Sequence, residues 1–274
     1  MIIGRFIDIW NVNEMKIFDS HCHLDDKAYR KDLDRVIERA HQAGVVRMMS
    51  IGVNKKTAAR AVELAESHPG IYASVGYHPH DASQCGAGEL DVLTELAQNP
   101  HVRAWGEIGL DYNRMYSPRE DQEKWFIRQL QIAVELTLPV IFHERDTRGR
   151  FLEILKTDFK NENAGVVHCF SGTLPELEHY LNLGLYIGIT GILTLRARGA
   201  DLRDMVPHIP ADRLVVETDA PYLTPAPEKY HTRRNEPAFV KLVLLKLAEV
   251  RNEDPDQLAQ TIWDNTCKLY NLEA

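Results

Sequence analysis

Six side chains of types that bind metal ions stand at or directly after the ends of short apolar runs. They are His21 and His23 in IFDSHCHLD, Glu107 in VRAWGEIGLD, His143 in LPVIFHERD, His168 in AGVVHCFSG, and Asp219 in RLVVETDAP. A short apolar run that stops at a polar residue is typical of a buried parallel strand that presents its last side chain to a site. Each residue alone is more simply explained as a structural histidine or a loop carboxylate. The five runs together predict a metal-dependent hydrolase built on a β/α barrel.

His21 and His23 are separated by a single residue. Alternate residues of an extended chain point to the same side, so the two imidazoles can bind one ion while Cys22 points away. Two unrelated histidines would give the same motif. Asp19, two residues upstream on the same side of the strand, favours the ligand interpretation.

Glu107 and Asp219 are the acidic members of the set. A carboxylate has two oxygens, so Glu107 could bridge two ions, with His143 and His168 binding the second one. Asp219 could complete the shell of the first ion and accept a proton from the attacking water, or it could cap the turn before Pro221. Two divalent ions carry more charge than these two carboxylates, so the net positive site would attract anionic substrates.

Two such ions suit the hydrolysis of a phosphoester. At a separation of about 3.5–4 Å they can stabilise both the attacking and the leaving oxygen, and they lower the pKa of a water molecule to roughly 7. Mixed nitrogen and oxygen ligands suit Zn, Mn, Ni or Co, and suit Mg less well. The sequence predicts two divalent metal ions and does not determine their identity.

His78 and Arg145 are candidates for binding the substrate. His78, in GYHPHD, could donate a hydrogen bond to a phosphate or to the leaving oxygen, or it could be a loop histidine packed beside Pro79. Arg145, two residues after His143, could bind a phosphate through two hydrogen bonds, or it could pair with Asp146.

Three features near these candidates are expected to be structural. We expect His80 to be a surface loop residue and Asp111 to hold the loop after Glu107. The basic loop at residues 229–237, which contains Tyr230, is most simply a solvated loop.

Strand and helix patterns alternate along the whole chain. Strands are predicted at residues 16–19, 46–51, 71–76, 102–106, 139–143, 165–168, 185–189 and 214–218. Helices are predicted at residues 32–43, 57–67, 89–98, 119–136, 147–156, 175–183, 202–208, 237–250 and 255–269. Eight strands that alternate with helices predict a parallel sheet closed into a TIM-like (β/α)8 barrel. An open doubly wound sheet is the alternative, but no GxGxxG motif follows the first strand.

This architecture agrees with the positions of the candidate ligands, because active residues of such barrels lie at the C-terminal ends of the strands. Residues 15–274 are predicted to form a single barrel domain. Residues 1–14 are an N-terminal extension, which is either an added strand or cap or the product of an upstream start codon.

The composition excludes several classes of protein. The formal charge is −8, with 40 acidic and 32 basic residues, so a protein that coats nucleic acid is not expected. No apolar run approaches the roughly 20 residues that span a bilayer, and the first residues lack the apolar core of a signal peptide. Four widely spaced cysteines favour a reducing compartment, so we expect a cytoplasmic protein. The sequence does not determine the oligomeric state.

The chain resembles the TatD family of metal-dependent deoxyribonucleases, within the amidohydrolase superfamily. The resemblance is carried by the blocks DSHCHLD, GYHPHD, GEIGLDY, PVIFHERD, VVHCFSG, VETDAPYL and RNEP, in this order from Phe18 to Pro237. It implies a TIM-like barrel in which the six candidates are the metal ligands, with Glu107 as the bridge, Asp219 as ligand and proton acceptor, and His78 near the substrate. It also implies hydrolysis of phosphoester bonds in DNA, single-stranded or at strand ends, by an exonuclease of DNA repair or degradation.

Two other functions were weighed against this one. The first is an amidohydrolase-superfamily esterase or amidase, for example a D-aminoacyl-tRNA deacylase. Many binuclear members that act on amides, lactones or phosphotriesters bridge their ions with a carboxylated lysine on the fourth strand, where this chain has Glu107. The second is a binding protein on a barrel scaffold, which would be expected to have lost one or more ligands, and none is missing.

Overall fold

The computed structural model describes residues 15–159 and 164–274, and these contain one sheet of eight parallel strands in sequence order. Each strand pairs in parallel with the next one along the chain. The strands are β1 (Ile17–Cys22), β2 (Val45–Ile51), β3 (Ile71–Val75), β4 (Val102–Asp111), β5 (Val140–Arg145), β6 (Gly165–Val167), β7 (Tyr186–Ile189) and β8 (Leu214–Val216). The predicted extension at residues 1–14 lies outside the described residues.

The two edges of the sheet, β1 and β8, meet at the end of the barrel where the strands finish. Cys22 and Ala220 form a parallel bridge. The backbone N–H of Asp219 donates to the carbonyl of His21 at 2.9 Å, and that of His23 donates to the carbonyl of Ala220 at 2.7 Å. The predicted TIM-like barrel is therefore confirmed, and the seam of its closure runs through three of the candidate ligands.

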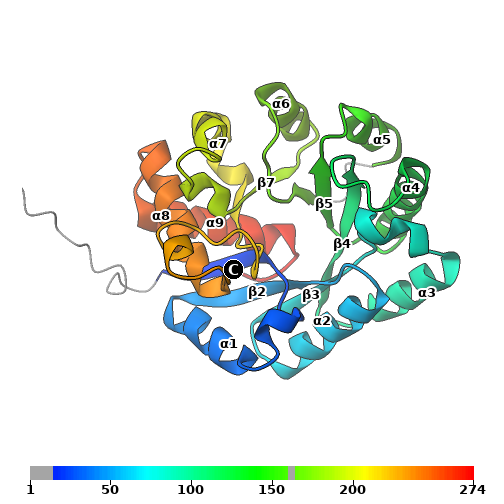
Figure 1. The fold of residues 1–274 in the computed structure, drawn as a ribbon, viewed down its shortest axis with the longest axis horizontal. Coiled ribbons are helices and arrows are strands. Elements are labelled where there is room, and N and C mark those ends of the chain that lie inside the picture. Colours follow the sequence, from blue (N-terminus) through cyan, green and yellow to red (C-terminus); the bar gives the residue numbers. More distant parts are fainter. Residues whose placement is uncertain (1–14, 160–163) are drawn as a thin grey trace, which may run out of the picture.

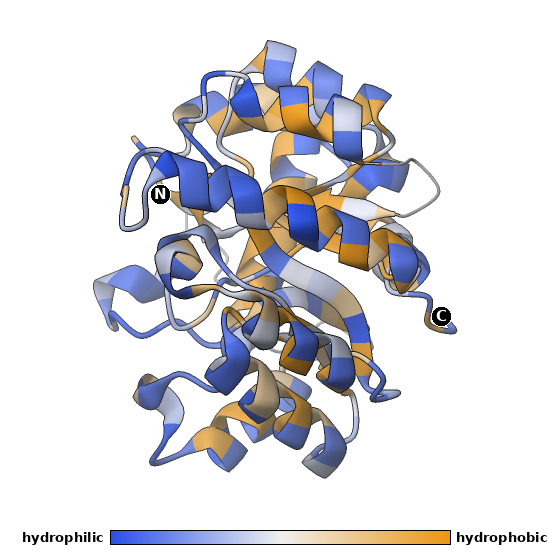
Figure 2. Ribbon diagram, turned by 90° about the vertical axis from the view of Figure 1, so that its right-hand side faces the viewer, coloured by the Kyte–Doolittle hydropathy of each residue, from blue (hydrophilic) through white to orange (hydrophobic). Residues whose placement is uncertain are grey.

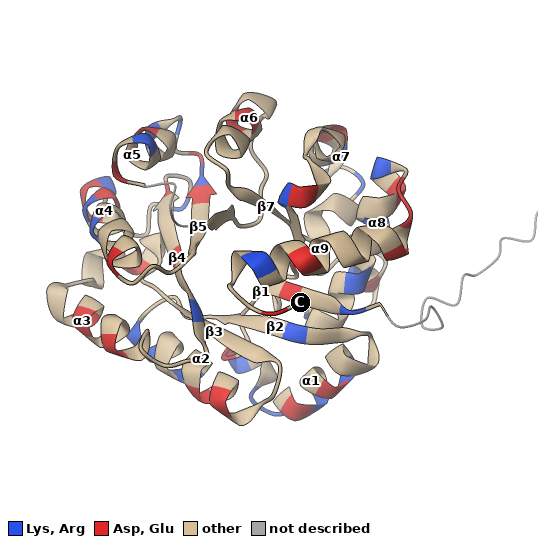
Figure 3. Ribbon diagram, turned by 180° about the vertical axis from the view of Figure 1, so that it is seen from behind, with Lys and Arg blue, Asp and Glu red and all other residues tan. Residues whose placement is uncertain are grey.

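Helices surround the strands (Figure 1). They are α1 (Leu33–Gln42), α2 (Lys55–Ser67), α3 (Ala87–Leu96), α4 (Arg119–Glu135), α5 (Arg150–Asp158), α6 (Leu174–Asn182), α7 (Ala200–Met205), α8 (Val240–Arg251) and α9 (Pro255–Leu269). Figure 2 shows hydrophobic and hydrophilic residues on the same helices, as expected of helices with one face on the sheet and one in water. Basic and acidic residues are interspersed over these helices (Figure 3).

Helix α2 shows how local sequence sets these boundaries. The side chain of Asn54 accepts hydrogen bonds from the backbone N–H groups of Lys56 and Thr57, and the Thr57 hydroxyl accepts from the backbone N–H of Asn54. This reciprocal cap satisfies donors that the first turn of a helix leaves free. The helix then buries one face, which consists of Ala58, Ala61, Val62, Leu64 and Ala65.

The inside of the barrel holds a separate hydrophobic cluster. Most strands contribute to it, with Phe18, Met49, Ala104, Ile141, Val166, Tyr186 and Val215 among the contributing residues. Trp263 and Tyr270 join it from α9 and the residue that follows α9, and the Tyr270 hydroxyl donates to the Ser20 carbonyl at 2.9 Å. The C-terminal helix is therefore part of the barrel core, and Figure 3 shows it beside β1.

Three strands run further at their C-terminal ends than the sequence predicted. β1 continues to Cys22, β4 to Asp111 and β5 to Arg145, because pairing with neighbouring strands persists beyond the first polar residue. In β4, Ile108 pairs with Phe142 and Asp111 pairs with Arg145 of β5. The ligands His21 and Glu107 consequently lie within strands and not after them. In the described residues, no helix is long and apolar enough to cross a membrane.

Gly109 is the position where β4 and β5 approach most closely beside the site. Its φ is +147°, a region that side chains disfavour, and a Cβ atom there would overlap the carbonyl oxygen of His143. Only glycine therefore allows β5 to bring His143 up to Glu107.

We expect Gly109→Ala to lower the free energy of unfolding by about 3 kcal/mol or more, because the backbone strain and the overlap add. The matched control is Gly88→Ala in α3, where nothing lies within 4 Å of the added atom. Alanine there should be neutral or stabilise the helix by about 0.5–1 kcal/mol. Denaturant unfolding of both variants measures this. Equal stability of the two variants would contradict the assignment of a close approach at Gly109.

Candidate metal centre

The structure brings all six candidate ligands together at the C-terminal end of the barrel. Glu107 lies at the centre of the group and is 3% exposed. Its Oε1 lies 2.8 Å from His143 Nδ1 and 3.9 Å from His168 Nε2, and its Oε2 lies 3.4 Å from His21 Nε2. One carboxylate therefore faces histidines of three other strands or strand ends.

His21, His23 and Asp219 form one half of the group. The Oδ1 atom of Asp219 lies 3.3 Å from His23 Nε2 and 3.7 Å from His21 Nε2. His21 and His23, together with Glu107, offer ligand atoms that lie within 4.8 Å of one another. This half matches the predicted first ion, for which the two imidazoles of the HxH motif and two carboxylates would be the ligands.

His143 and His168 form the other half, and each contacts an outer carboxylate through the nitrogen that faces away from Glu107. His143 Nε2 donates to Asp111 Oδ2 at 3.2 Å, and His168 Nδ1 lies 2.8 Å from Glu217 Oε1. Such carboxylates orient metal-binding histidines and fix which nitrogen is free to bind. The remaining ring nitrogens, Nδ1 of His143 and Nε2 of His168, both face Glu107.

Glu217 and the second role of Asp111 were missed from the sequence. Asp111 holds its loop as predicted, because it accepts the backbone N–H groups of Asn113 and Arg114. It also accepts hydrogen bonds from two histidines of the site. Glu217 stands two residues before Asp219, and this alternate spacing was the signal that could have identified it.

The prediction that His80 is a surface loop residue was wrong. Its Nε2 donates to Asp111 Oδ2 at 2.7 Å, and its side chain is 30% exposed. The loop after β3 folds into η2 (Pro79–Gln84), which places His80 over the end of β4. The sequence hid this because the partner, Asp111, is 31 residues away.

His78 lies at the edge of the same group, with Nε2 3.5 Å from Glu107 Oε1. Its Nδ1 accepts the backbone N–H of His80 at 3.1 Å. A neutral imidazole has one proton, so this bond places the proton on Nε2, which points towards Glu107. His78 is therefore oriented as a donor and not as a metal ligand, although it lies within reach of His80 and His143.

The charges of the buried groups depend on one another. Burial alone would lower the pKa of His143, but its hydrogen bonds with Asp111 and Glu107 outweigh burial and raise the pKa to about 9. Burial is likewise outweighed at His168, where the charges of Glu217 and Glu107 raise the pKa to about 10. Burial dominates at His78 and lowers its pKa to about 4, so this ring is neutral at pH 7.

The two acidic candidates are held ionised. Burial would raise the pKa of Glu107, but the surrounding imidazoles outweigh it and hold the pKa well below its usual range. The same balance, with His23 as the main partner, lowers the pKa of Asp219. Both groups are therefore carboxylates at neutral pH, the form that binds cations.

The donor set fits divalent metal ions. Both ring nitrogens of His21 are buried and have no hydrogen-bond partner in the described part of the chain. Buried polar atoms are normally paired, so an unpaired imidazole that faces two carboxylates is explained by a cation between them. Nitrogen and oxygen ligands at this spacing suit zinc and related transition metals.

Arg145 follows His143 on β5 at an alternate position, so both side chains lie on the same face of the strand. The guanidinium has no ion pair among the residues described here. Asp146, the partner considered from the sequence, accepts instead from the side-chain amide of Asn113 at 2.6 Å. The pairing alternative for Arg145 is therefore not realised in this structure.

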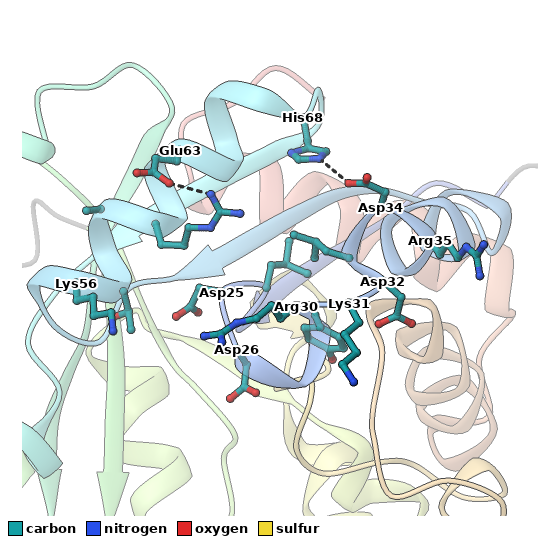
Figure 4. A pocket seen from close by; sticks show the side chains of 16 residues that line it. Asp25, Asp26, Arg30, Lys31, Asp32, Asp34, Arg35, Lys56, Glu63 and His68 are labelled. Carbon is teal, nitrogen blue, oxygen red and sulfur yellow. Dashed lines mark hydrogen bonds and ion pairs between the residues drawn. The ribbon is translucent and has the colours of Figure 1, made fainter.

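A groove of about 1090 Å³ is lined by the segment after β1 and by residues of α1 and α2 (Figure 4). Acidic and basic side chains line it together; Arg60 pairs with Glu63 within α2, and His68 pairs with Asp34 of α1. It contains none of the six candidate ligands. One of its lining residues, Asp26, accepts a hydrogen bond at Oδ2 from the hydroxyl of Tyr222 at 3.0 Å.

The fold and the histidine–carboxylate clusters define a hydrolase of the metal-dependent β/α-barrel type. Residues 18–271 match the family model described as TatD related DNase, so the chain belongs to this family, whose members hydrolyse phosphoester bonds. It is 46% identical to the 3'-5' ssDNA/RNA exonuclease TatD of Rahnella sp. (strain Y9602), over 94% of this chain and 99% of that protein. It is 41% identical to the protein of the same name from Escherichia fergusonii, over 93% and 99% of the two chains.

Solved structures of similar proteins have the same barrel fold. The TatD homologue YjjV from Escherichia coli K12 superposes with a TM-score of 0.85 at 31% identity, covering 94% of this chain and 99% of that one. An organophosphorus hydrolase from Deinococcus radiodurans is similar in fold alone, with a TM-score of 0.62 at 14% identity, covering 94% of this chain and 93% of that one.

Metal binding should release protons, because His143 and His168 must lose theirs to become ligands. With pKa values of about 9 and 10, both rings are protonated at pH 7 in the metal-free protein. Raising the pH from 7 towards 9 removes this competition, so the apparent affinity for Zn²⁺ should rise by up to about tenfold per pH unit for each proton released.

Calorimetric titration in buffers of different ionisation enthalpy measures the protons released, and we expect about two at pH 7. The Asp111→Asn variant removes the carboxylate whose hydrogen bond contributes most to the raised pKa of His143, so it should release about one proton fewer. A pH-independent affinity would contradict the charge states derived above.

Proposed function

We propose that the chain binds two divalent metal ions through His21, His23, Glu107, His143, His168 and Asp219. His21, His23 and Asp219 would hold the first ion, His143 and His168 would hold the second, and Glu107 would contribute to both. The observation that carries this proposal is the position of Glu107, whose two oxygens face different sets of imidazoles. When bound, such ions supply Lewis acidity to a phosphoryl group and lower the pKa of water.

Two residues of the chain act on protons and hydrogen bonds in this scheme. Asp219 is ionised and its side chain is 15% exposed, so it can accept the proton that an attacking water loses. His78 directs an Nε2–H group into the site and donates a hydrogen bond to a phosphoryl or leaving oxygen. With a pKa of about 4, it serves as a neutral donor and does not carry a positive charge.

Arg145 binds a phosphate of the substrate. Its guanidinium is free of ion pairs among the described residues and lies on the same face of β5 as His143. A guanidinium can hold two phosphate oxygens at once. It would therefore hold a phosphate of the substrate near His143, the alternate residue on the same face of β5.

The substrate is the end of a single DNA strand, and the enzyme acts as an exonuclease. The relatives at 46% and 41% identity are named 3'-5' ssDNA/RNA exonucleases, which supports this substrate class and extends it to RNA. The net charge of −8 argues against a long duplex-binding surface and agrees with a site that grips only a few phosphates. Four free cysteines support the assignment to the cytoplasm, where thiols stay reduced.

Glu107→Gln and His143→Ala should each lower kcat/KM on single-stranded DNA more than about 100-fold, since loss of an outer carboxylate alone costs 10–100-fold in such sites. The assay uses oligonucleotides labelled at the 3' or the 5' end, with Mg²⁺, Mn²⁺ or Zn²⁺ added after chelation. His41→Ala, on the exposed side of α1, is the control and should keep full activity. Full activity of both ligand variants would refute the proposed site.

Arg145→Lys should raise KM about tenfold with a smaller change in kcat, because lysine keeps the charge but loses the two-point hydrogen bond. His78→Ala should instead lower kcat, because its donor acts on the reacting group. Steady-state kinetics on the same oligonucleotide separate the two effects. Identical changes in both variants would contradict the distinct roles assigned to them.

A further inference from the structure

Exposed aromatic rings gather at the mouth of the metal centre. Of the six large hydrophobic side chains that are exposed in the described residues, four lie in the loops after β4 and β8: Met115, Tyr116, Tyr222 and Tyr230. Single exposed hydrophobic residues are ordinary on a protein surface. Tyr116 and Tyr222 differ from the others because each ring contacts a histidine of the centre.

Tyr222 borders the half of the centre that contains His23 and Asp219. Its ring centroid lies 5.7 Å from that of His23, at 70° to it, and the side chain is 51% exposed. Its hydroxyl donates to Asp26 Oδ2, so the ring is held at both its body and its tip. A ring fixed in this way, with much of its surface open, is a preformed stacking platform.

Tyr116 borders the other half. Its ring centroid lies 4.8 Å from that of His80, at 75°, and the side chain is 66% exposed. His80 in turn donates to Asp111, which also accepts from His143. The two tyrosines therefore stand on the two sides of the candidate ions, one beside each half of the ligand set.

We propose that Tyr116 and Tyr222 stack the nucleobases on either side of the scissile phosphate and so make the site selective for unpaired strands. This inference rests on the nuclease activity proposed above. An aromatic ring stacks with any base, whatever its sequence. Bases inside a duplex are already stacked and paired, so they must leave the helix before they can use these rings.

The negative net charge of the protein explains why stacking would be needed for substrate affinity. A chain with net charge −8 gains little from general attraction to phosphates, which is the main source of affinity in basic nucleic-acid-binding proteins. Stacking does not depend on charge, so it holds a strand at the mouth without a basic surface. Affinity that comes from bases should also depend less on salt than affinity that comes from phosphates.

The test combines protein variants with substrates that lack bases. Tyr116→Leu and Tyr222→Leu should each raise KM about tenfold on a single-stranded oligonucleotide. On an oligonucleotide whose last two residues are abasic, the KM of each variant should lie within about twofold of the wild-type KM, because the base that would stack on the ring is absent. Tyr116→Phe keeps the ring and should behave as the wild type. Tyr230→Leu changes an equally exposed tyrosine that has no contact with the site among the described residues, and it is the matched control.

The outcomes separate this inference from the proposed function. If the wild type hydrolyses neither substrate, the nuclease function itself fails. The wild type could be active and show the same preference for natural over abasic ends as the leucine variants. The stacking role would then be wrong, and the proposed nuclease function would be unaffected. A loss that is equal on both substrates would indicate damage to the metal centre, would overturn the stacking role, and would be visible as reduced metal content.

Discussion

The buried carboxylate of Glu107 sets the condition that the rest of the centre must satisfy. A carboxylate removed from water costs several kcal/mol unless charge and hydrogen bonds compensate it. Here the compensation comes from imidazoles at 2.8 to 3.9 Å, which belong to β1, β5, the end of β6 and the loop after β3. These segments converge on one point only in a closed barrel. The chemistry of the site and the closure of the fold are therefore one constraint.

Outer carboxylates make this arrangement rigid. Asp111 and Glu217 hold the rings of His143 and His168 from behind, each through the nitrogen that is not needed for a metal. Asp19 ties β1 to β8, because its carboxylate accepts the backbone N–H and the hydroxyl of Thr218. Burial raises the pKa of Asp19 to about 8, because the ionised form of this carboxyl group is unfavourable away from water. Hydrogen bonds from such buried groups hold the strands that carry the candidate ligands in place.

The residues proposed to perform the chemistry and those proposed to select the substrate occupy different parts of the site. Three of the six candidate ligands, His21, Glu107 and His168, are buried, and the other three are partly exposed. The groups that would distinguish one phosphoester from another, Arg145 and the two exposed tyrosines, lie at its rim. The chain carries a net charge of −8, so discrimination has to come from a few placed contacts and not from general attraction to phosphates.

The sequence by itself determined the strand order, the barrel and the six ligand candidates, because each ligand follows a local apolar run that any buried strand must have. It did not determine how far β4 extends, since pairing with β5 sustains the strand through Asp111. Nor could it locate His80, whose partner is distant in the chain, and it indicated Glu217 only through the alternate spacing with Asp219. Which nitrogen of each histidine faces the centre was likewise decided only by tertiary structure. A local pattern records burial and direction, whereas the identity of a hydrogen-bond partner depends on segments that the closure of the barrel brings together.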